Sequence, residues 1–298
     1  MQTRRGYAAL LATIFIWGTT FVATKVLLRQ VGPLQLTLLR FVIAFLVLLP
    51  FAVRQGFKLK DIFNPTFMLF GLTGTTLYYA LQNLGMSFTS ISSTSLILSI
   101  VPVLTAILAV IFLKEKLSRL RVVGIVLVTA GVALIAIYSG GSSESSKPLL
   151  GNLLVFAGGL SWAVYTIQGR KMVGDFPALR MTTASTGAGL LFLVPFAVWE
   201  AFTSGLPHFD LLGAADLLYL GVIASALTMF LWNYSLHYLP ASVASTYINL
   251  VPIIGVASGY LLGEKPPLLQ LVGGLLAIVG VWVSSLSPAG AQTSPPQS

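Results

Sequence analysis

The sequence predicts an all-α integral membrane protein with ten transmembrane helices, arranged as two inverted five-helix repeats around a central cavity. Three observations predict this fold. Only 8% of the 298 residues are charged and 56% are hydrophobic, whereas a soluble domain has about 25% charged residues. The hydrophobic residues form ten runs, each close to the roughly 20 residues that cross a bilayer. Matching residues also recur in the same order in both halves of the chain.

The internal repeat is visible as residues that recur at a nearly constant spacing. PFAV occurs at residues 50–53 and again at 195–198, a spacing of 145, and Trp17 matches Trp162 at that spacing. Further pairs follow at spacings of 150 and 149: Asn83 and Asn233, Ser95 and Ser245, Pro102 and Pro252, Glu115 and Glu264. Ordered matches with small drifts in spacing indicate two halves of common ancestry.

The expected spans follow one another with short connections. They cover residues 7–28, 34–53, 66–88, 91–113, 119–138, 149–169, 179–200, 213–236, 241–262 and 268–286. The first repeat is expected at 1–140 and the second at 149–288, with a polar linker at 141–148 between them. The tail at 289–298 contains Ser, Pro and Gln and is expected to be disordered.

Basic residues predict a multipass protein of the cell (inner or plasma) membrane with both termini in the cytoplasm. In this orientation the cytoplasmic side holds Arg4, Arg5, Arg54, Lys58, Lys60, Lys114, Lys116, Arg119, Arg121, Arg170, Lys171 and Arg180. The outer side holds only Lys25, Arg29, Lys147 and Lys265. Cytoplasmic loops carry such an excess of Lys and Arg. Because each repeat has an odd number of spans, the second would be inverted, as in secondary transporters with a substrate site near the bilayer midplane.

Two matching polar stripes are the first candidates for the wall of a cavity. They consist of Ser92, Ser95, Ser99 and the expected hinge Pro102 on the fourth span, and of Ser242, Ser245, Asn249 and the expected hinge Pro252 on the ninth. Spacings of three and four residues place each set on one helix face. Each proline weakens the backbone hydrogen bonding near it. The alternative is that the serines bond to their own helix and serve packing.

Two further groups combine aromatic rings with polar side chains. The first and sixth spans contribute Trp17, Thr20, Trp162, Tyr165 and Gln168; the third and eighth contribute Tyr78, Tyr79, Gln82, Asn83, Trp232 and Asn233. Buried amides and hydroxyls need partners, which a polar substrate could supply. The rings could instead form an interfacial belt or plain packing. Asn83 and Asn233 could instead tie helices together.

Arg40 is a charged residue inside an expected span. It lies about 9 Å from the outer end of the second span at 1.5 Å per residue, and an arginine at a helix centre costs about 2.5–3.5 kcal/mol on insertion scales. The matching residue is Ser185, so the repeat itself does not require a cation. We expect Arg40 to bind a carboxylate or phosphate or to close an outer gate, with snorkelling to helix-end carbonyls as the alternative. Lys25 and its copy Arg170 are expected to be interfacial anchors.

Other features narrow the class of protein. Without cysteine and with two histidines, the chain is expected to hold no metal, and no cofactor is expected. Phosphate-loop, HExxH and GxSxG motifs are absent, which argues against an ATP-driven pump or an enzyme. The basic residues are scattered, so nucleic acid is not expected. The expected partners are the lipid bilayer and a small-molecule substrate. Glycines such as Gly255 and Gly259 permit close helix packing and a possible homodimer.

Four segments resemble the EamA-like family of the drug/metabolite transporter (DMT) superfamily. They are WGTTFVATK (17–25), LLRFVIAF (38–45), VPVLTAILAVIFLKEKLS (101–118) and its copy VPIIGVASGYLLGEKPP (251–267). The resemblance covers about residues 6–286. It implies export of a small metabolite, often an amino acid, by alternating access around a central cavity. A nucleotide-sugar, phosphate-ester or drug carrier is an alternative of the same fold, and a membrane scaffold or receptor without transport is an alternative of another class.

Overall fold

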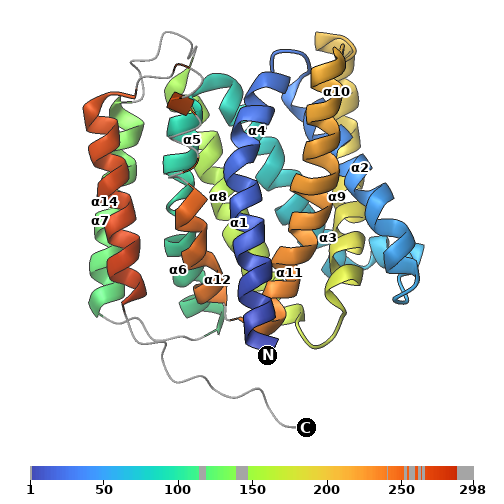
Figure 1. Cartoon of the computed structure of the whole chain (residues 1–298), viewed down its shortest axis with the longest axis horizontal. Helices are drawn as coiled ribbons and strands as arrows, with labels where there is room; N and C mark the ends of the chain where they lie inside the picture. The colour runs from blue at the N-terminus through green and yellow to red at the C-terminus, as the bar shows by residue number, and fades with distance from the viewer. Residues whose placement is uncertain are drawn as a thin grey trace.

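The computed structural model describes residues 2–113, 119–138, 147–239, 241–251, 254, 259–260, 263 and 266–286 (Figure 1). The elements before the linker are α1 (Gln2–Leu27), α2 (Pro33–Val53), η1 (Leu59–Phe63), α3 (Pro65–Gly71), η2 (Leu72–Leu77), α4 (Tyr78–Phe88), α5 (Ile91–Leu98), α6 (Val101–Leu113) and α7 (Arg119–Tyr138). Those after it are α8 (Pro148–Met172), α9 (Ala178–Ser204), α10 (Leu211–Leu218), η4 (Tyr219–Leu227), α11 (Thr228–Tyr238), α12 (Ala241–Tyr247), η5 (Ile248–Leu250) and α14 (Leu268–Ser285). All of these elements are helical, so the all-α prediction is confirmed for the described residues.

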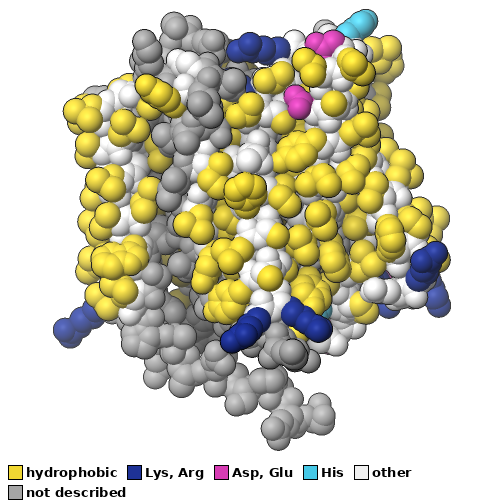
Figure 2. All heavy atoms as spheres, viewed as in Figure 1, with side chains coloured by type: hydrophobic (Ala, Val, Ile, Leu, Met, Phe, Trp, Pro, Cys, Tyr) yellow, Lys and Arg dark blue, Asp and Glu magenta, His cyan; other side chains and the backbone are white. Residues whose placement is uncertain are grey.

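The helices are long and apolar enough for a bilayer. Six stretches of the described chain meet both conditions: Arg4–Leu27, Pro33–Val53, Ile91–Phe112, Pro148–Met172, Ala178–Ser204 and Leu211–Tyr238. Large apolar side chains point outward, among them Phe15, which is 67% exposed, and Phe202, which is 87% exposed. Figure 2 shows such side chains covering the sides of the bundle, with Lys and Arg gathered at its ends. This surface suits lipid rather than water.

Two expected spans contain a π-helical segment in their middle. The third span runs through α3, η2 and α4, and the eighth through α10, η4 and α11. Both begin alike, because Asn64 accepts a hydrogen bond from the Thr66 N–H at 2.9 Å and Asp210 accepts one from the Gly213 N–H at 2.7 Å. π-Helical turns are rare and often occur at functional sites. The helices that cross these two segments are therefore a candidate region for function.

The fourth span is broken where the sequence places a proline. α5 ends at Leu98 and α6 begins at Val101, directly before Pro102. The missing N–H of a proline is harmless in the first turn of a helix, so Pro102 starts α6 rather than bending a continuous helix. The matching Pro252 lies outside the described residues, as do Glu115, Glu264 and 255–258.

Close crossings hold the two halves together near the π-helical segments. α2 packs on η4, and α9 packs on η2. A Cβ on Gly71 would meet the backbone oxygen of Ser185, and one on Gly221 would lie 2.6 Å from the Ile43 side chain and 3.2 Å from the Arg40 carbonyl oxygen. Only glycine permits helices to approach this closely. α7 and α14 pair at one edge of the bundle (Figure 1).

α9 is also tied at both of its ends, to the start of α2 at one end and to η1 at the other. At one end Glu200 accepts hydrogen bonds from the N–H groups of Leu34 and Gln35 at 2.9 and 2.8 Å, as a carboxylate does favourably at a helix N-terminus. At the other end Arg180 donates to both carboxylate oxygens of Asp61, at 2.9 and 3.0 Å. The hydrogen bonds from Arg180 hold the pKa of Asp61 below its ordinary value.

Candidate functional site

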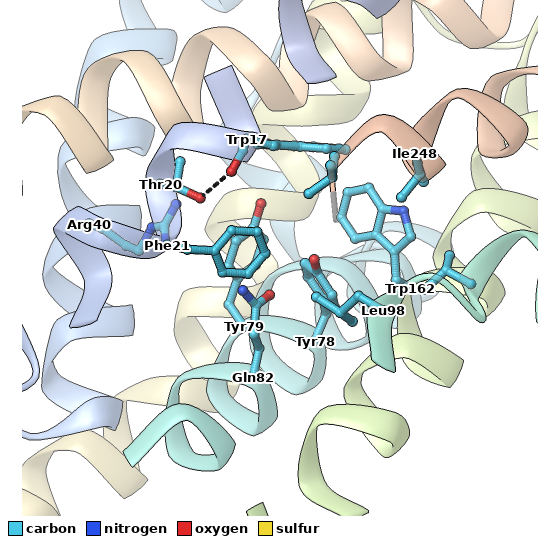
Figure 3. Close-up of a pocket in the computed structure, with 12 residues that line it drawn as sticks. Trp17, Thr20, Phe21, Arg40, Tyr78, Tyr79, Gln82, Leu98, Trp162 and Ile248 are labelled. Atoms are coloured by element: carbon cyan, nitrogen blue, oxygen red, sulfur yellow. Dashed lines mark hydrogen bonds between the residues drawn. The ribbon is translucent and has the colours of Figure 1, made fainter. Parts of the chain in front are cut away.

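A small cavity lies in the interior of the bundle where the first, second, third, fourth, sixth and ninth expected spans meet (Figure 3). Its lining residues are Trp17, Thr20, Phe21, Arg40, Tyr78, Tyr79, Gln82, Leu98, Val101, Trp162, Ile248 and Val251. The cavity has a volume of about 30 Å³, which is room for about two water molecules. Sites for small-molecule ligands are larger, about 300–1,000 Å³. The wall therefore has to move before a metabolite can enter.

Arg40 supplies the positive charge of the cavity. Its side chain is 2% exposed, and its Nε donates to the Ser225 hydroxyl at 2.8 Å while Nη2 lies 3.4 Å from the carbonyl oxygen of Ala224. Both acceptors belong to the π-helical segment η4. The guanidinium carbon also lies 4.7 Å from the ring centre of Tyr79. Among the described residues no Asp or Glu forms an ion pair with Arg40, so an anionic ligand would complete its charge balance.

Aromatic rings form the opposite side of the cavity. The Trp17 ring contacts Trp162 edge-on at 5.1 Å and Trp232 at 5.4 Å. Tyr78 lies 4.6 Å from Trp162 and 4.7 Å from Tyr79. Ring pairs at these separations stabilise one another and fix the wall geometry. The Trp17 indole N–H is itself held by the Thr228 hydroxyl at 2.9 Å.

Two fully buried polar atoms of the lining have no hydrogen-bond partner among the described residues. They are the Gln82 Oε1, an acceptor, and the Trp162 Nε1, a donor. The Nε1 of Trp232, a ring that contacts both Trp17 and Trp162, is also unpartnered there. Buried polar atoms are nearly always hydrogen-bonded. Unpartnered atoms on a cavity wall therefore indicate where a polar ligand would bind.

The structure brings seven of the candidate residues together and leaves the others elsewhere. The seven that line the cavity are Trp17, Thr20, Arg40, Tyr78, Tyr79, Gln82 and Trp162. The Thr20 hydroxyl is bonded to the Trp17 carbonyl at 2.7 Å, as Figure 3 shows. Trp232 supports this wall from behind through its ring contacts.

Three of the polar candidates bond to protein groups instead of facing the cavity. Asn83 donates to the Thr37 hydroxyl at 2.8 Å. Asn233 donates to the Tyr165 hydroxyl at 2.8 Å and to the Thr182 hydroxyl at 2.9 Å. These amides therefore tie neighbouring helices together, which is the alternative that the sequence left open. The Tyr165 ring in addition stacks on Phe70 at 4.1 Å.

The serine stripes do not form the cavity wall. Ser95 donates to the Ser92 carbonyl at 3.0 Å and Ser99 to the Leu96 carbonyl at 2.6 Å. A hydroxyl in an apolar interior has a backbone oxygen of its own helix within reach, which explains this result. Ser245 is buried and Gln168 is half-buried, and neither is part of the lining. The side chain of Asn249 lies outside the described residues.

The wall also contains residues that the sequence did not single out. Leu98, Val101, Ile248 and Val251 come from the fourth and ninth spans, and Phe21 comes from α1. Ser225, which holds Arg40, was missed as well. Ser225 is a polar residue in an apolar span, which is only a weak sign of a contact with Arg40. The π-helical segment η4 that contains Ser225 has no signature in the sequence.

Comparisons with known proteins identify the family of this chain. The sequence profile of the EamA-like transporter family matches residues 4–137 and, separately, residues 149–286. This chain belongs to the EamA-like transporter family. It is thus a membrane transporter of the drug/metabolite transporter superfamily, as the resemblance in its motifs implied.

Similar proteins extend over nearly the whole chain. An uncharacterized transporter of Archaeoglobus fulgidus is 30% identical over 282 residues, which cover 92% of this chain and 94% of the relative. A probable terminal-alkyne amino-acid exporter of Streptantibioticus cattleyicolor is 29% identical over 286 residues, with 94% and 93% covered. A solved structure with 16% identity has a TM-score of 0.67 and is matched over 96% of both chains. At that identity the likeness concerns the fold alone.

Proposed function

We propose that this transporter exports a small metabolite that carries a carboxylate, with amino acids as the first class to test. Transport would proceed by alternating access, with two inverted five-helix repeats at 1–140 and 149–288 rocking against each other. Binding of the substrate would shift the population between inward-open and outward-open states. The cavity of about 30 Å³ fits a closed state on such a path.

The observation that carries this proposal is Arg40. A buried guanidinium without an acidic partner among the described residues lines a cavity in the middle of the bundle. Guanidinium binds carboxylate with good geometry. A carboxylate also fits a cavity with one arginine better than a nucleotide sugar or phosphate ester, which carries more negative charge. The name of the Streptantibioticus relative, a probable amino-acid exporter, points the same way.

Matching contacts in the two halves support the repeat. The Asn83–Thr37 hydrogen bond of the first half has the counterpart Asn233–Thr182 in the second. Lys25 donates to the Met86 carbonyl at 2.7 Å, and its copy Arg170 donates to the Leu236 carbonyl at 2.9 Å. The spacings between these pairs are the same 145 and 150 residues found in the sequence. The family profile also matches the chain twice.

The proposed orientation places both termini in the cytoplasm of a cell whose plasma or inner membrane holds the protein. The excess of basic residues on that side supports this assignment. In this orientation the Asp61–Arg180 tie faces the cytoplasm and the Glu200 tie faces outward. Substrate would enter past the first tie and leave past the second.

The test is counterflow in proteoliposomes with a panel of labelled amino acids, using the wild type, Arg40→Gln and a matched control, Arg29→Gln. Arg29 is exposed at the end of α1 and lies outside the cavity. We expect Arg40→Gln to reduce accumulation of the transported amino acid at least about 30-fold, because truncating one partner of a buried charge pair costs about 2–5 kcal/mol. We expect Arg29→Gln to transport like the wild type.

Other outcomes would change the proposal in defined ways. If the folded wild type in liposomes accumulates no amino acid but does accumulate a sugar nucleotide or a drug, the substrate class is wrong. If no solute of any class accumulates, the scaffold or receptor alternative gains support. If both arginine variants transport normally, Arg40 has no role in binding.

A further inference from the structure

We propose that Gln82 accepts a hydrogen bond from the protonated amine of the substrate, with the Tyr78 and Trp162 rings beside it, so that the cavity selects 2-amino acids over 2-hydroxy acids. This inference rests on the proposed function and assigns the second charged group of the substrate. Arg40 binds the carboxylate, and Gln82 binds the amine. Selectivity between the two acids then depends on one side chain.

The first observation is the unpartnered oxygen of Gln82. The side chain is 6% exposed and lines the cavity, and its Oε1 has no hydrogen-bond partner among the described residues. Gln82 stands four residues after Tyr78 and three after Tyr79 on the same helix, α4. Residues at these spacings share one helix face, so the amide oxygen and both rings are presented to the same space (Figure 3).

The second observation is the set of rings around this oxygen. The faces of aromatic rings carry partial negative charge and attract cations within about 6 Å. Tyr79 already holds the Arg40 guanidinium at 4.7 Å, and Tyr78 and Trp162 lie 4.6 Å apart on the other side of the cavity. Figure 3 shows Gln82 between Arg40 on one side and Trp162 on the other. An amine near Gln82 would therefore meet an acceptor and ring faces.

The third observation is the charge of the wall. No lining residue is acidic, and one, Arg40, is positive. A free cationic amine would be repelled by Arg40, and a simple anion would leave the Gln82 oxygen without a donor. A zwitterion satisfies both groups, because its carboxylate lies between its amine and the guanidinium.

The experiment measures the ratio of two inhibition constants in counterflow. One belongs to the transported amino acid and the other to the 2-hydroxy acid with the same carbon skeleton. A hydrogen bond to a charged group contributes enough to make the wild type prefer the amino acid by about 10- to 100-fold. Gln82→Met keeps the length of the side chain and removes the acceptor, so the ratio should fall to within about threefold of one.

Gln35→Met is the matched control. Gln35 is also a buried glutamine with an unpartnered Oε1, but it lies at the start of α2, outside the cavity lining. Its ratio should equal that of the wild type. A ratio that Gln82→Met leaves unchanged would overturn the inference. So would an equal fall in Gln35→Met, since the effect would then come from losing any buried amide.

A second variant keeps the inference testable if Gln82→Met does not fold. Gln82→Glu places an anionic acceptor at the same position, and we expect it to raise the preference for the amino acid and to admit amines without a carboxylate. A fall in the ratio would contradict the inference. If the wild type binds neither the amino acid nor the hydroxy acid, the proposed function itself fails, which is a different result from binding both equally.

Discussion

Two helix crossings in this transporter share a backbone arrangement and differ in chemistry. Where α2 crosses η4, Gly221 allows close approach to the Arg40 backbone. Where α9 crosses the junction of α3 and η2, Gly71 does the same for Ser185. In the first crossing Arg40 reaches across to Ser225. In the second the Ser185 hydroxyl turns back to the Thr182 carbonyl at 3.0 Å, and the Thr75 hydroxyl has no partner among the described residues.

The difference separates features that occur in both halves of the chain from a charge that occurs in one half. Glycine and the π-helical segments fix how the helices cross, and they occur on both sides. The cation occurs on one side only. The two crossings are thus alike in backbone and unlike in charge, and under the proposed function substitutions at matching positions should have unequal effects.

The largest effect is expected from transferring the charge to the other crossing. Ser185 is fully buried against the backbone at Gly71 and does not line the cavity. Ser185→Arg should therefore lower the free energy of unfolding by about 3–5 kcal/mol, because the new charge is buried without a partner. Thermal unfolding in detergent measures this. Arg40→Ser should remain folded while losing transport; a stable Ser185→Arg protein would show that packing does not enforce the asymmetry.

The serine that holds Arg40 should matter more than its counterpart. Ser225→Ala removes an acceptor from a buried guanidinium, and hydrogen bonds to charged groups contribute about 1.5–3 kcal/mol. Thr75→Val removes a hydroxyl that bonds to nothing among the described residues, so it should be neutral or slightly stabilising. Melting temperatures of the two variants provide the comparison. Equal losses would argue against the Arg40–Ser225 contact.

The two crossing glycines should differ by a smaller amount. Adding a Cβ at a close crossing costs about 1–3 kcal/mol. Gly71→Ala meets two backbone atoms, the Ser185 oxygen and the Gly189 nitrogen, whereas the closest atoms that Gly221→Ala meets belong to the Ile43 side chain, with the Arg40 carbonyl oxygen farther away at 3.2 Å. Gly71→Ala should thus lie at the upper end of the range and Gly221→Ala at the lower end in thermal unfolding. The reverse order would mean that the α9 crossing is the looser one.

The smallest effect is expected at the first turns of α2 and α9. Arg180 pairs with Asp61, while its counterpart Gln35 donates to the Gly205 carbonyl at 3.0 Å. The side chain of Arg180 is 28% exposed, so Arg180→Gln should cost at most about 1 kcal/mol. The folded pKa of Asp61 is lowered, so this stability is present above the ordinary Asp pKa of about 3.9 and is lost as the pH falls through the folded value.

The pH dependence of the melting temperature is the control for the Arg180–Asp61 ion pair. When the pH is lowered from 7 to 3, the melting temperature of the wild type should fall by more than that of Arg180→Gln. Equal losses in both proteins would show that the ion pair contributes nothing to stability.

Seven of the residues that line the cavity were candidates from the sequence, and the differences between candidates and lining have physical causes. Arg40, Trp17 and Trp162 were found because charge and large rings are conspicuous in apolar spans, and the repeat located matching positions. Ser95 and Ser99 bond to their own helix, which is the alternative that the sequence left open, because a stripe on one helix face does not reveal which neighbour that face meets.

The π-helical segments explain the remaining difference. A π-helical turn has hydrogen bonds between residues five apart instead of four, which rotates every later side chain around the helix axis. No local residue pattern predicts such a turn. The π-helical segment η4 directs Ser225 toward α2, while Asn83 and Asn233 lie against Thr37 and Thr182. The sequence left two roles open for these amides, lining the cavity or tying helices together, and their hydrogen bonds fit the second.

The central claim is that Arg40 binds the carboxylate of the substrate, and the most direct measurement compares an amino acid with its primary amide. Binding constants of both ligands are measured on the wild type and on Arg40→Gln. The account predicts that Arg40→Gln weakens binding of the amino acid at least about 30-fold and binding of the amide by less than about threefold. Equal weakening of both ligands would contradict it, because Arg40 would then shape the cavity without contacting the carboxylate.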